Sequence, residues 1–314
     1  MIRQKALRKI LLTTITFFIL LFISVFPKST ENSIKTNLEV EYITGLGTNT
    51  IYLLNKDNYL VKSKILLDSS KKEEQVKKII SNLTISDNSI FPNGLKAIIP
   101  ANTKLLGLNY EDDVVTLNFS KEFFNINKDL STQLISALVF SITSLNDIDG
   151  ITLQVEGKEL TTYPNKNLEL DKVLTKDIGI NKIVNITSFN NIQKIVLYYV
   201  NKVNNDEYYV PVTKYLNDDR DKIQIIIDEL TTSYIYEPNL MSFLNNNLKL
   251  INYEKKENVL FLNFNNLLCD KNNKIIKEVK YSLAYSIFDN YNVKEVVLEQ
   301  EGKEVENILK EKLP

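Results

Sequence analysis

Apolar and polar residues alternate along this chain with the periods of short strands and amphipathic helices. Every second residue is apolar between Val115 and Phe119, which is typical of a half-buried strand. Between Val76 and Leu83, apolar residues recur at spacings of three and four, which predicts one apolar helix face. The elements predicted in this part of the chain are strands at Ile51–Leu54 and Tyr59–Leu67, a helix through Val76–Leu83, a hairpin of Leu105–Tyr110 and Val114–Ser120, a helix at Ser131–Leu145 and a strand at Ile151–Val155.

The same pattern returns 145 residues further along the chain. VTLNFS at Val115–Ser120 returns as LFLNFN at Leu260–Asn265, and VEGKEL at Val155–Leu160 returns as QEGKEV at Gln300–Val305. A constant offset over several predicted elements indicates two copies of one domain. Because two copies are too few for a solenoid with a shared core, we expect each copy to close its own core.

The second copy predicts the same order of elements. They are strands at Val196–Val200 and Tyr208–Val212, a helix through Ile223–Leu230, a strand at Leu260–Phe264, a helix through Val279–Ile287, a strand at Val296–Leu298 and a short final helix at Val305–Leu313. Each domain therefore reads β-β-α-β-β-α-β, an α+β fold. Helices with a single apolar stripe are expected to cover one face of a small sheet, which leaves the other face to water or a partner.

The first 27 residues differ from the rest of the chain. Four basic residues precede Ile10–Phe26, a run of 17 residues without a charge. This length is at the short end for a membrane-spanning helix, and the basic flank places the N-terminal end in the cytoplasm. We expect a transmembrane signal anchor at the cell membrane, a single pass with everything after Pro27 extracytoplasmic; the alternative is a cleaved secretory signal.

Composition divides the remainder into four segments. We expect a polar tether at residues 28–49, a first domain at 50–160, a linker at 161–192 that is richer in Asn, Lys and Asp, and a second domain at 193–314. After the basic N-terminus, 34 basic residues face 39 acidic ones, a net charge of −5. An acidic ectodomain without basic clusters argues against a nucleic-acid partner.

The residue inventory argues against an enzyme. The chain contains no histidine, which excludes Ser-His-Asp and Cys-His triads and the usual zinc ligand sets. No glycine-rich phosphate loop is present among the eight glycines. Cys269 is the only cysteine, so no intrachain disulfide can form, and we expect it to act as a small apolar residue. The sequence predicts no catalytic, cofactor-binding or metal-binding residues.

Two acidic motifs can be interpreted as chemistry or as turns. Asp112-Asp113 is a paired carboxylate, but it joins two predicted strands, so a solvated turn is favoured. Glu156-Gly157-Lys158-Glu159 recurs as Glu301-Gly302-Lys303-Glu304 and could bind a cation or protonate a sugar oxygen. Its recurrence favours a turn that glycine permits, because a duplicated fold retains its turns.

Tyrosine is concentrated in the second half of the chain, where eleven of the sixteen lie from Tyr198 onward. The pairs Tyr198-Tyr199 and Tyr208-Tyr209 fall on predicted strands. Aromatic side chains can anchor protein partners or stack on sugars, although tyrosine also simply favours strands. We take these four residues as candidate interface residues, with the exposed member of each pair as the contact.

The sequence resembles the GerMN domain family of spore germination and sporulation proteins. The resemblance rests on the segment Ile99–Leu106, the strand Val114–Ser120 with the following Lys121-Glu122-Phe123, and the strand that ends at Glu156-Gly157. In the second copy, Tyr209–Thr213 is similar to the family's opening strand, whereas Leu244-Asn245-Asn246 lacks the proline and Asn265 replaces the serine.

The resemblance implies a compact domain related to ring-building modules and a non-enzymatic role in assembling extracytoplasmic complexes. Relatives are often lipoproteins, so a membrane helix without a lipidated cysteine is a departure from the family. Three hypotheses follow. The first is an anchored scaffold whose partners are other sporulation and envelope membrane proteins; the second is a peptidoglycan- or glycan-binding protein that uses the tyrosines; the third is a carboxylate-based wall hydrolase.

Overall fold

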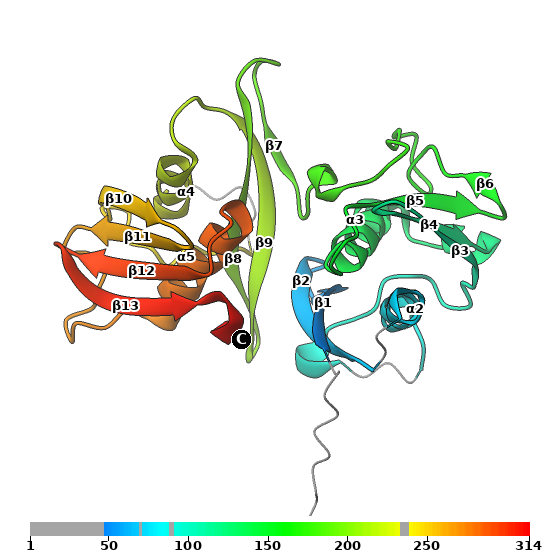
Figure 1. Ribbon diagram of the computed structural model, residues 1–314, viewed down its shortest axis with the longest axis horizontal. Helices are drawn as coiled ribbons and strands as arrows, with labels where there is room; N and C mark the ends of the chain where they lie inside the picture. Colours follow the sequence, from blue (N-terminus) through cyan, green and yellow to red (C-terminus); the bar gives the residue numbers. More distant parts are fainter. Residues whose placement is uncertain (1–46, 69–70, 88–90, 233–238) are drawn as a thin grey trace, which may run out of the picture. The chain divides into compact units, whose positions relative to one another are not determined.

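The computed structural model describes residues 47–68, 71–87, 91–232 and 239–314 and contains two α+β domains (Figure 1). Each domain has its own buried hydrophobic cluster, as the repeat predicts. The predicted anchor, Ile10–Phe26, lies outside the described residues. Within the described ranges, no helix has the length and apolar character needed to cross a membrane.

Domain 1 contains two sheets and two α-helices. The elements are β1 (Gly47–Leu54), β2 (Leu60–Leu67), α2 (Lys72–Leu83), β3 (Leu105–Glu111), β4 (Val114–Phe119), α3 (Ser131–Ile142), β5 (Gly150–Val155) and β6 (Lys158–Glu159). Strands β1 and β2 form an antiparallel hairpin of their own, and the second sheet has the order β3-β4-β5-β6. Its central pair, β4 and β5, is parallel because α3 carries the chain back to the end of the sheet at which β4 begins.

Domain 2 repeats this arrangement with a longer opening hairpin. The elements are β8 (Ile192–Val203), β9 (Asp206–Asn217), α4 (Lys222–Thr231), β10 (Leu250–Lys256), β11 (Val259–Phe264), α5 (Lys277–Asn290), β12 (Glu295–Gln300) and β13 (Lys303–Leu309). The four-stranded sheet has the order β10-β11-β12-β13 and the same parallel central pair. Single 3-10 turns lie at Pro92–Gly94, Lys121–Phe124, Lys128–Leu130, Lys176–Ile178 and Lys310–Lys312.

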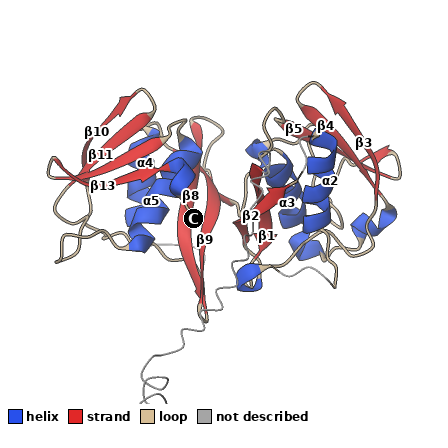
Figure 2. Cartoon of the chain, turned by 60° about the horizontal axis from the view of Figure 1, so that its bottom comes forward, coloured by secondary structure: helices blue, strands red, loops and turns tan. Residues whose placement is uncertain are grey.

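The helices of each domain lie between the hairpin and the four-stranded sheet (Figure 2). The prediction of one sheet per domain is therefore wrong, because the opening strands do not join the larger sheet. Ten of the twelve residues of α3 are buried, so this helix packs on two sides and its apolar surface is not a single stripe. The helices still cover only one face of each four-stranded sheet, as predicted.

The predicted final helix at Val305–Leu313 is also wrong. Residues 303–309 form β13, which pairs antiparallel with β12, and only Lys310–Lys312 make a helical turn. Val305, Ile308, Leu309 and Leu313 do recur at helical spacing, but the edge of β12 offers unpaired backbone N–H and C=O groups, and pairing with them decides the conformation. In domain 1 the equivalent strand β6 has only two residues.

The repeated sequence motifs make the same hydrogen bonds between side chain and backbone in both domains. Asn118 of the first Leu-Asn-Phe motif accepts a hydrogen bond from Gly157 N–H at 2.9 Å, and Asn263 of the second accepts one from Gly302 N–H at 2.8 Å. Each glycine and the glutamate before it have positive φ, which is the geometry of a two-residue type I′ hairpin turn. The turn interpretation of the repeated EGKE motif is thus confirmed.

The substitution of serine by Asn265 in the second copy preserves a second bond. In domain 1, Ser120 Oγ accepts from Lys104 N–H at 3.0 Å; in domain 2, Asn265 Oδ1 accepts from Lys249 N–H at 3.2 Å. Both side chains present an oxygen to a backbone donor at the start of the hairpin, so the fold tolerates either residue. Asp112-Asp113 also forms a turn, with Asp112 at φ 52°, as predicted.

Residues 161–192 are packed along much of their length. Tyr163, Leu174 and Ile180 are buried in the core of domain 1. Further along, β7 (Ile183–Asn185) pairs in parallel with β9 of domain 2. This segment therefore belongs to both domains' packing, and the domains form one compact unit.

Candidate interaction site between the two domains

The opening hairpins of the two domains meet in the interior of this unit. Strand β2 contacts β9, and Val61 of β2 is buried in the hydrophobic core of domain 2. Asn55 Nδ2 donates to Asn201 Oδ1 at 2.9 Å, and both side chains are buried. Asn55 directly follows β1, and Asn201 lies at the matching position in β8. The two copies therefore contact each other through equivalent residues.

Further hydrogen bonds of the Asn201 and Asn181 side chains satisfy polar groups at this junction. Asn201 Nδ2 also donates to Asp57 Oδ2 and to Asn239 O, each at 2.8 Å. Asn181 bridges the hairpins: its amide donates to Leu60 O at 2.8 Å and Pro211 O at 2.7 Å, and its oxygen accepts from Leu60 N–H at 3.0 Å. Because buried polar groups are costly when unpaired, these bonds fix the register of one hairpin against the other.

A charged and aromatic cluster closes the adjacent side of the junction. Lys62 of β2 forms an ion pair with Asp289 of α5 at 3.0 Å, and Asp289 also accepts from Tyr198 OH at 2.6 Å. The Lys62 ammonium lies 4.9 Å from the Tyr198 ring centroid, and that ring stacks on Tyr285 at 5.0 Å. Burial is the main cause that raises the pKa of Tyr198, and the nearby Asp289 carboxylate adds to it. The phenol therefore stays a hydrogen-bond donor at neutral pH.

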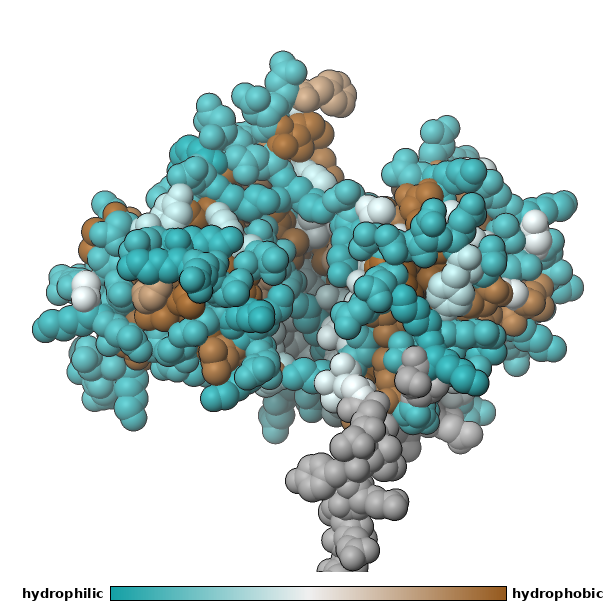
Figure 3. Space-filling model, viewed as in Figure 1, coloured by the Kyte–Doolittle hydropathy of each residue, from teal (hydrophilic) through white to brown (hydrophobic). Residues whose placement is uncertain are grey.

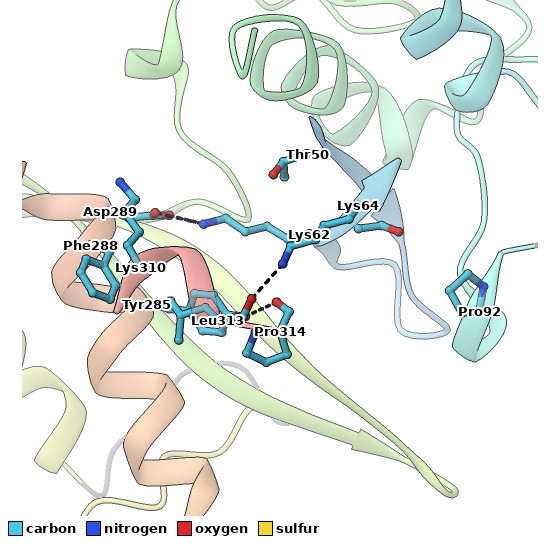
Figure 4. Close-up of a pocket in the computed structure, with 11 residues that line it drawn as sticks. Thr50, Lys62, Lys64, Pro92, Tyr285, Phe288, Asp289, Lys310, Leu313 and Pro314 are labelled. Carbon is cyan, nitrogen blue, oxygen red and sulfur yellow. Dashed lines mark hydrogen bonds and ion pairs between the residues drawn. The ribbon is translucent and has the colours of Figure 1, made fainter. Parts of the chain in front are cut away.

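A cavity of about 420 Å³ opens beside this cluster (Figure 4). Domain 1 contributes β1, β2 and the turn at Pro92–Gly94, and domain 2 contributes α5 and the last residues of the chain. Its lining residues are Thr50, Lys62, Ser63, Lys64, Pro92, Tyr285, Phe288, Asp289, Lys310, Leu313 and Pro314. Lys64 Nζ donates to Leu313 O at 2.8 Å across the opening. Both domains are thus needed to form the cavity.

Three lysines and one aspartate line the cavity, and one of these lysines, Lys62, is paired with that aspartate. Lys176 lies near enough to respond to these charges. Burial lowers the pKa of its ammonium; Asp289 opposes that shift, and Lys62 and Lys310 add to it. Burial also raises the pKa of Tyr285 to about 12. The ammonium of Lys62 lies over the rings of Tyr198 and Tyr285, which is the arrangement of a cation–π contact.

The four candidate tyrosines do not provide an outward platform. Tyr198, Tyr199 and Tyr208 are buried, and Tyr209 is half-buried against the rings of Tyr281 and Tyr285. The expectation of one exposed member in each pair is wrong for Tyr198-Tyr199. Tyr198 instead contacts Lys62, and Tyr208 OH donates to Asn93 O of domain 1. These two residues form an interface, but it is the internal one between the domains.

Sequence reasoning missed the residues that join the domains. Asn55 and Asn201 carried a signal, because both asparagines stand at matching positions of the repeat beside strong strand patterns. Lys62 and Asp289 carried no such signal, because one residue lies in each copy and the repeat does not retain the charge pair. An ion pair between domains cannot be inferred from the pattern of one domain.

The outward faces of the two four-stranded sheets differ in chemistry. In domain 1, Thr116 and Thr152 lie side by side with their hydroxyls 2.7 Å apart. At the matching positions of domain 2, Phe261 pairs with Val297, and Lys256 Nζ lies 5.2 Å from the Phe261 ring centroid. Phe261 is half-buried and Val297 is buried beneath its neighbours. Each domain therefore offers a helix-free sheet face, one polar and one with an apolar centre.

Among the described residues, no group of three or more Cys, Asp or Glu side chains is arranged to hold a metal ion. Cys269 is free and partly buried, and burial raises the pKa of its thiol. A thiol with a raised pKa is a weak nucleophile at neutral pH. The sequence predicts a buried small apolar residue at this core-type position, and the structure places Cys269 only partly buried.

Comparison with known proteins now identifies the family. The Germane family, described as "Sporulation and spore germination", matches residues 50–161 and 196–306. Spore germination protein GerM of Bacillus subtilis (strain 168) is 26% identical over 285 residues, which cover 88% of this chain and 77% of that protein. The solved tandem GerMN domains of the sporulation protein GerM from Bacillus subtilis match with a TM-score of 0.73 and 25% identity, over 82% of this chain and 92% of that structure.

These findings confirm the resemblance to the GerMN family and the duplication predicted from the sequence. The two matched segments together span more than half of the chain. This protein therefore belongs to the Germane family of sporulation and spore germination proteins and carries the family's domain twice.

Proposed function

We propose that this protein is a membrane-anchored, extracytoplasmic scaffold that assembles envelope protein complexes during sporulation or germination, without catalysing a reaction. The observation that supports it most is the junction: buried asparagines, an ion pair and shared apolar packing join two copies of the family's domain into one unit. A fixed pair of domains presents two sheet faces in a constant geometry.

A fixed pair also explains why two copies are useful. When two linked sites bind one assembly, the second binding event is intramolecular, and the combined affinity can exceed either single affinity by orders of magnitude. The polar face of domain 1 and the apolar-centred face of domain 2 suit different partner surfaces. The partners are other sporulation and envelope membrane proteins. Attachment is through Ile10–Phe26, with its basic flank in the cytoplasm.

Affinity capture of the full-length protein from sporulating cells tests the scaffold role. The wild type should recover envelope proteins, and a glutamate at either sheet face should weaken recovery. We would compare Thr116→Glu, Phe261→Glu and the double variant, with Ser81→Glu on the exposed side of α2 as a control of equal charge. The double variant should lose far more than either single one.

Three other outcomes would contradict the proposal. Recovery of no protein by the wild type would remove the scaffold role. Sedimentation with purified cell wall, instead of recovery with proteins, would favour the peptidoglycan-binding alternative. Membrane attachment is tested separately by mass spectrometry of the membrane fraction: the peptide that contains Ile10–Phe26 should remain on the mature protein, whereas its loss would indicate a cleaved secretory signal.

A further inference from the structure

The loop between β7 and β8 presents the most exposed large apolar side chain in the described part of the chain. Phe189 has 93% of its surface accessible. Val184 of β7 and Ile192, the first residue of β8, flank this loop and are 62% and 41% accessible. Figure 3 shows brown, apolar atoms at the tip that this loop occupies in Figure 1, surrounded by teal, hydrophilic ones. Exposing a phenylalanine ring forgoes the free energy of burying it, so we expect the ring to become buried against a binding partner.

The loop is held in one shape by a side chain from the next strand. Asn217 Oδ1, at the end of β9, accepts from the backbone N–H groups of Thr187 at 2.7 Å and Ser188 at 3.1 Å. Asn217 Nδ2 donates to Ser188 O at 2.9 Å and to Asn190 O at 2.6 Å. One amide thus ties the loop backbone on both sides of Phe189. A preorganised loop loses little conformational entropy when it binds.

The chemistry around Phe189 selects the kind of partner. No residue from Asn185 to Gln193 is charged. A loop that inserts into an anionic membrane surface normally adds lysine or arginine beside its apolar residues, and this loop has none. An aromatic anchor inside an uncharged polar rim is instead typical of a protein interface.

The shape of the loop argues against a second copy of this chain as the partner. A protruding tip with one phenylalanine ring, flanked by an apolar side chain on each adjoining strand, needs a concave partner, and two such tips cannot enclose each other. A stable symmetric dimer buries roughly 800 Å² on each side, much more than one loop tip supplies. The occupant must therefore bring its own cavity.

We propose that the Phe189 loop docks into an apolar, phenylalanine-sized cavity with an uncharged rim on a protein partner. The inference rests on the proposed scaffold function and deepens it by naming a contact surface that neither sheet face provides. Phe189 is the anchor, and Asn217 is a positioning residue that acts through the loop backbone.

The first experiment places a photo-crosslinker at the tip. The full-length protein with Phe189→p-benzoylphenylalanine is expressed in sporulating cells, irradiated and analysed by mass spectrometry. A cross-link to another protein is expected. A cross-link to a second copy of this chain or to lipid would overturn the inference, as would no cross-link from position 189 when the wild type still captures its partners.

The second experiment measures binding of the identified partner to purified full-length variants. Phe189→Ala should weaken binding at least tenfold, Phe189→Leu about two- to fivefold, and Asn217→Ala about threefold or more, because Asn217 only shapes the loop. Leu66→Ala removes another exposed apolar side chain, 61% accessible, on β2, outside both four-stranded sheets, and should change binding less than twofold.

The outcomes separate this inference from the proposed function. If the wild type captures partners and Phe189→Ala binds them equally well, the loop inference fails and the scaffold role stands. If the wild type captures no protein, the scaffold role fails. Unchanged thermal unfolding of Phe189→Ala shows that any loss of binding is local, since the ring makes little contact with the fold.

Discussion

The two domains retain the same internal backbone bonds but present different surfaces. In both copies a helix serine accepts from the opening strand: Ser141 Oγ from Tyr52 N–H and Ser286 Oγ from Tyr198 N–H, each at 2.9 Å. On the outer sheet faces, by contrast, Thr116 of domain 1 is replaced by Phe261 in domain 2. Side chains that satisfy buried backbone groups cannot change without leaving those groups unpaired, whereas a surface position can adapt to a new partner.

The largest expected effect tests whether each domain has its own core. Phe119 and Phe264 are fully buried at matching positions, one in each hydrophobic cluster. Phe119→Ala and Phe264→Ala should each lower the free energy of unfolding by about 3–5 kcal/mol. Hydrogen exchange followed by mass spectrometry should show faster exchange in the substituted domain. Equal loss of protection in both domains would mean that the two cores unfold as one.

The next effect concerns the junction that the equivalent asparagines form. Asn55→Ala and Asn201→Ala each leave a buried amide without its partner, so each should destabilise the protein by about 1–3 kcal/mol in urea unfolding. The double variant should cost less than the sum, because both single changes remove the same bond. Additive effects would indicate that the two side chains act independently, and would remove the argument for a fixed junction.

The order of elements could be predicted from the sequence because it depends on local periodicity. The apolar positions of Val76–Leu83 and Val115–Phe119 face the interior as their spacing predicts. The layer arrangement could not be predicted, because whether β1 and β2 join the larger sheet depends on contacts with α3 that no single period encodes. The final strand β13 was missed because pairing with β12, and not intrinsic preference, decides its conformation.

The candidate site was predicted less well than the fold. The tyrosine pairs were correctly placed on strands, but the period of a strand does not say which face another domain will cover. Tyr198 became part of the junction because Lys62 and Asp289 approach from two different domains. The Phe189 loop has no periodic signal at all, and its exposure follows from the bonds of Asn217.

A smaller effect tests whether the repeated turns are equivalent. Gly157 and Gly302 have φ of 76° and 74°, and an added Cβ would meet no atom within 4 Å at either position. Gly157→Ala and Gly302→Ala should therefore each cost about 1 kcal/mol from backbone strain alone. Gly47→Ala, also in open space but without positive φ, is the control and should be neutral. Unequal costs in thermal unfolding would show that the two turns carry different constraints.

The smallest effect near neutral pH comes from the unequal distribution of tyrosines. Burial raises the pKa of Tyr285 and Tyr291 in domain 2, and of Tyr110 in domain 1, to about 12. In the unfolded chain these phenols ionise near pH 10. Because the folded state keeps the proton, the stabilisation is fully present below about pH 10 and is lost as the pH rises through about 12.

Domain 2 should therefore lose more stability than domain 1 in alkaline solution, since burial also raises the pKa of its Tyr198, Tyr199 and Tyr209. Hydrogen exchange measured from pH 9 upward, corrected for the intrinsic exchange rate, should show domain 2 opening first. Absorbance at the tyrosinate band should rise together with that opening. If domain 1 opened first, the buried phenols of the second copy would not control its alkaline stability, and the difference between the copies would lie in surface contacts alone.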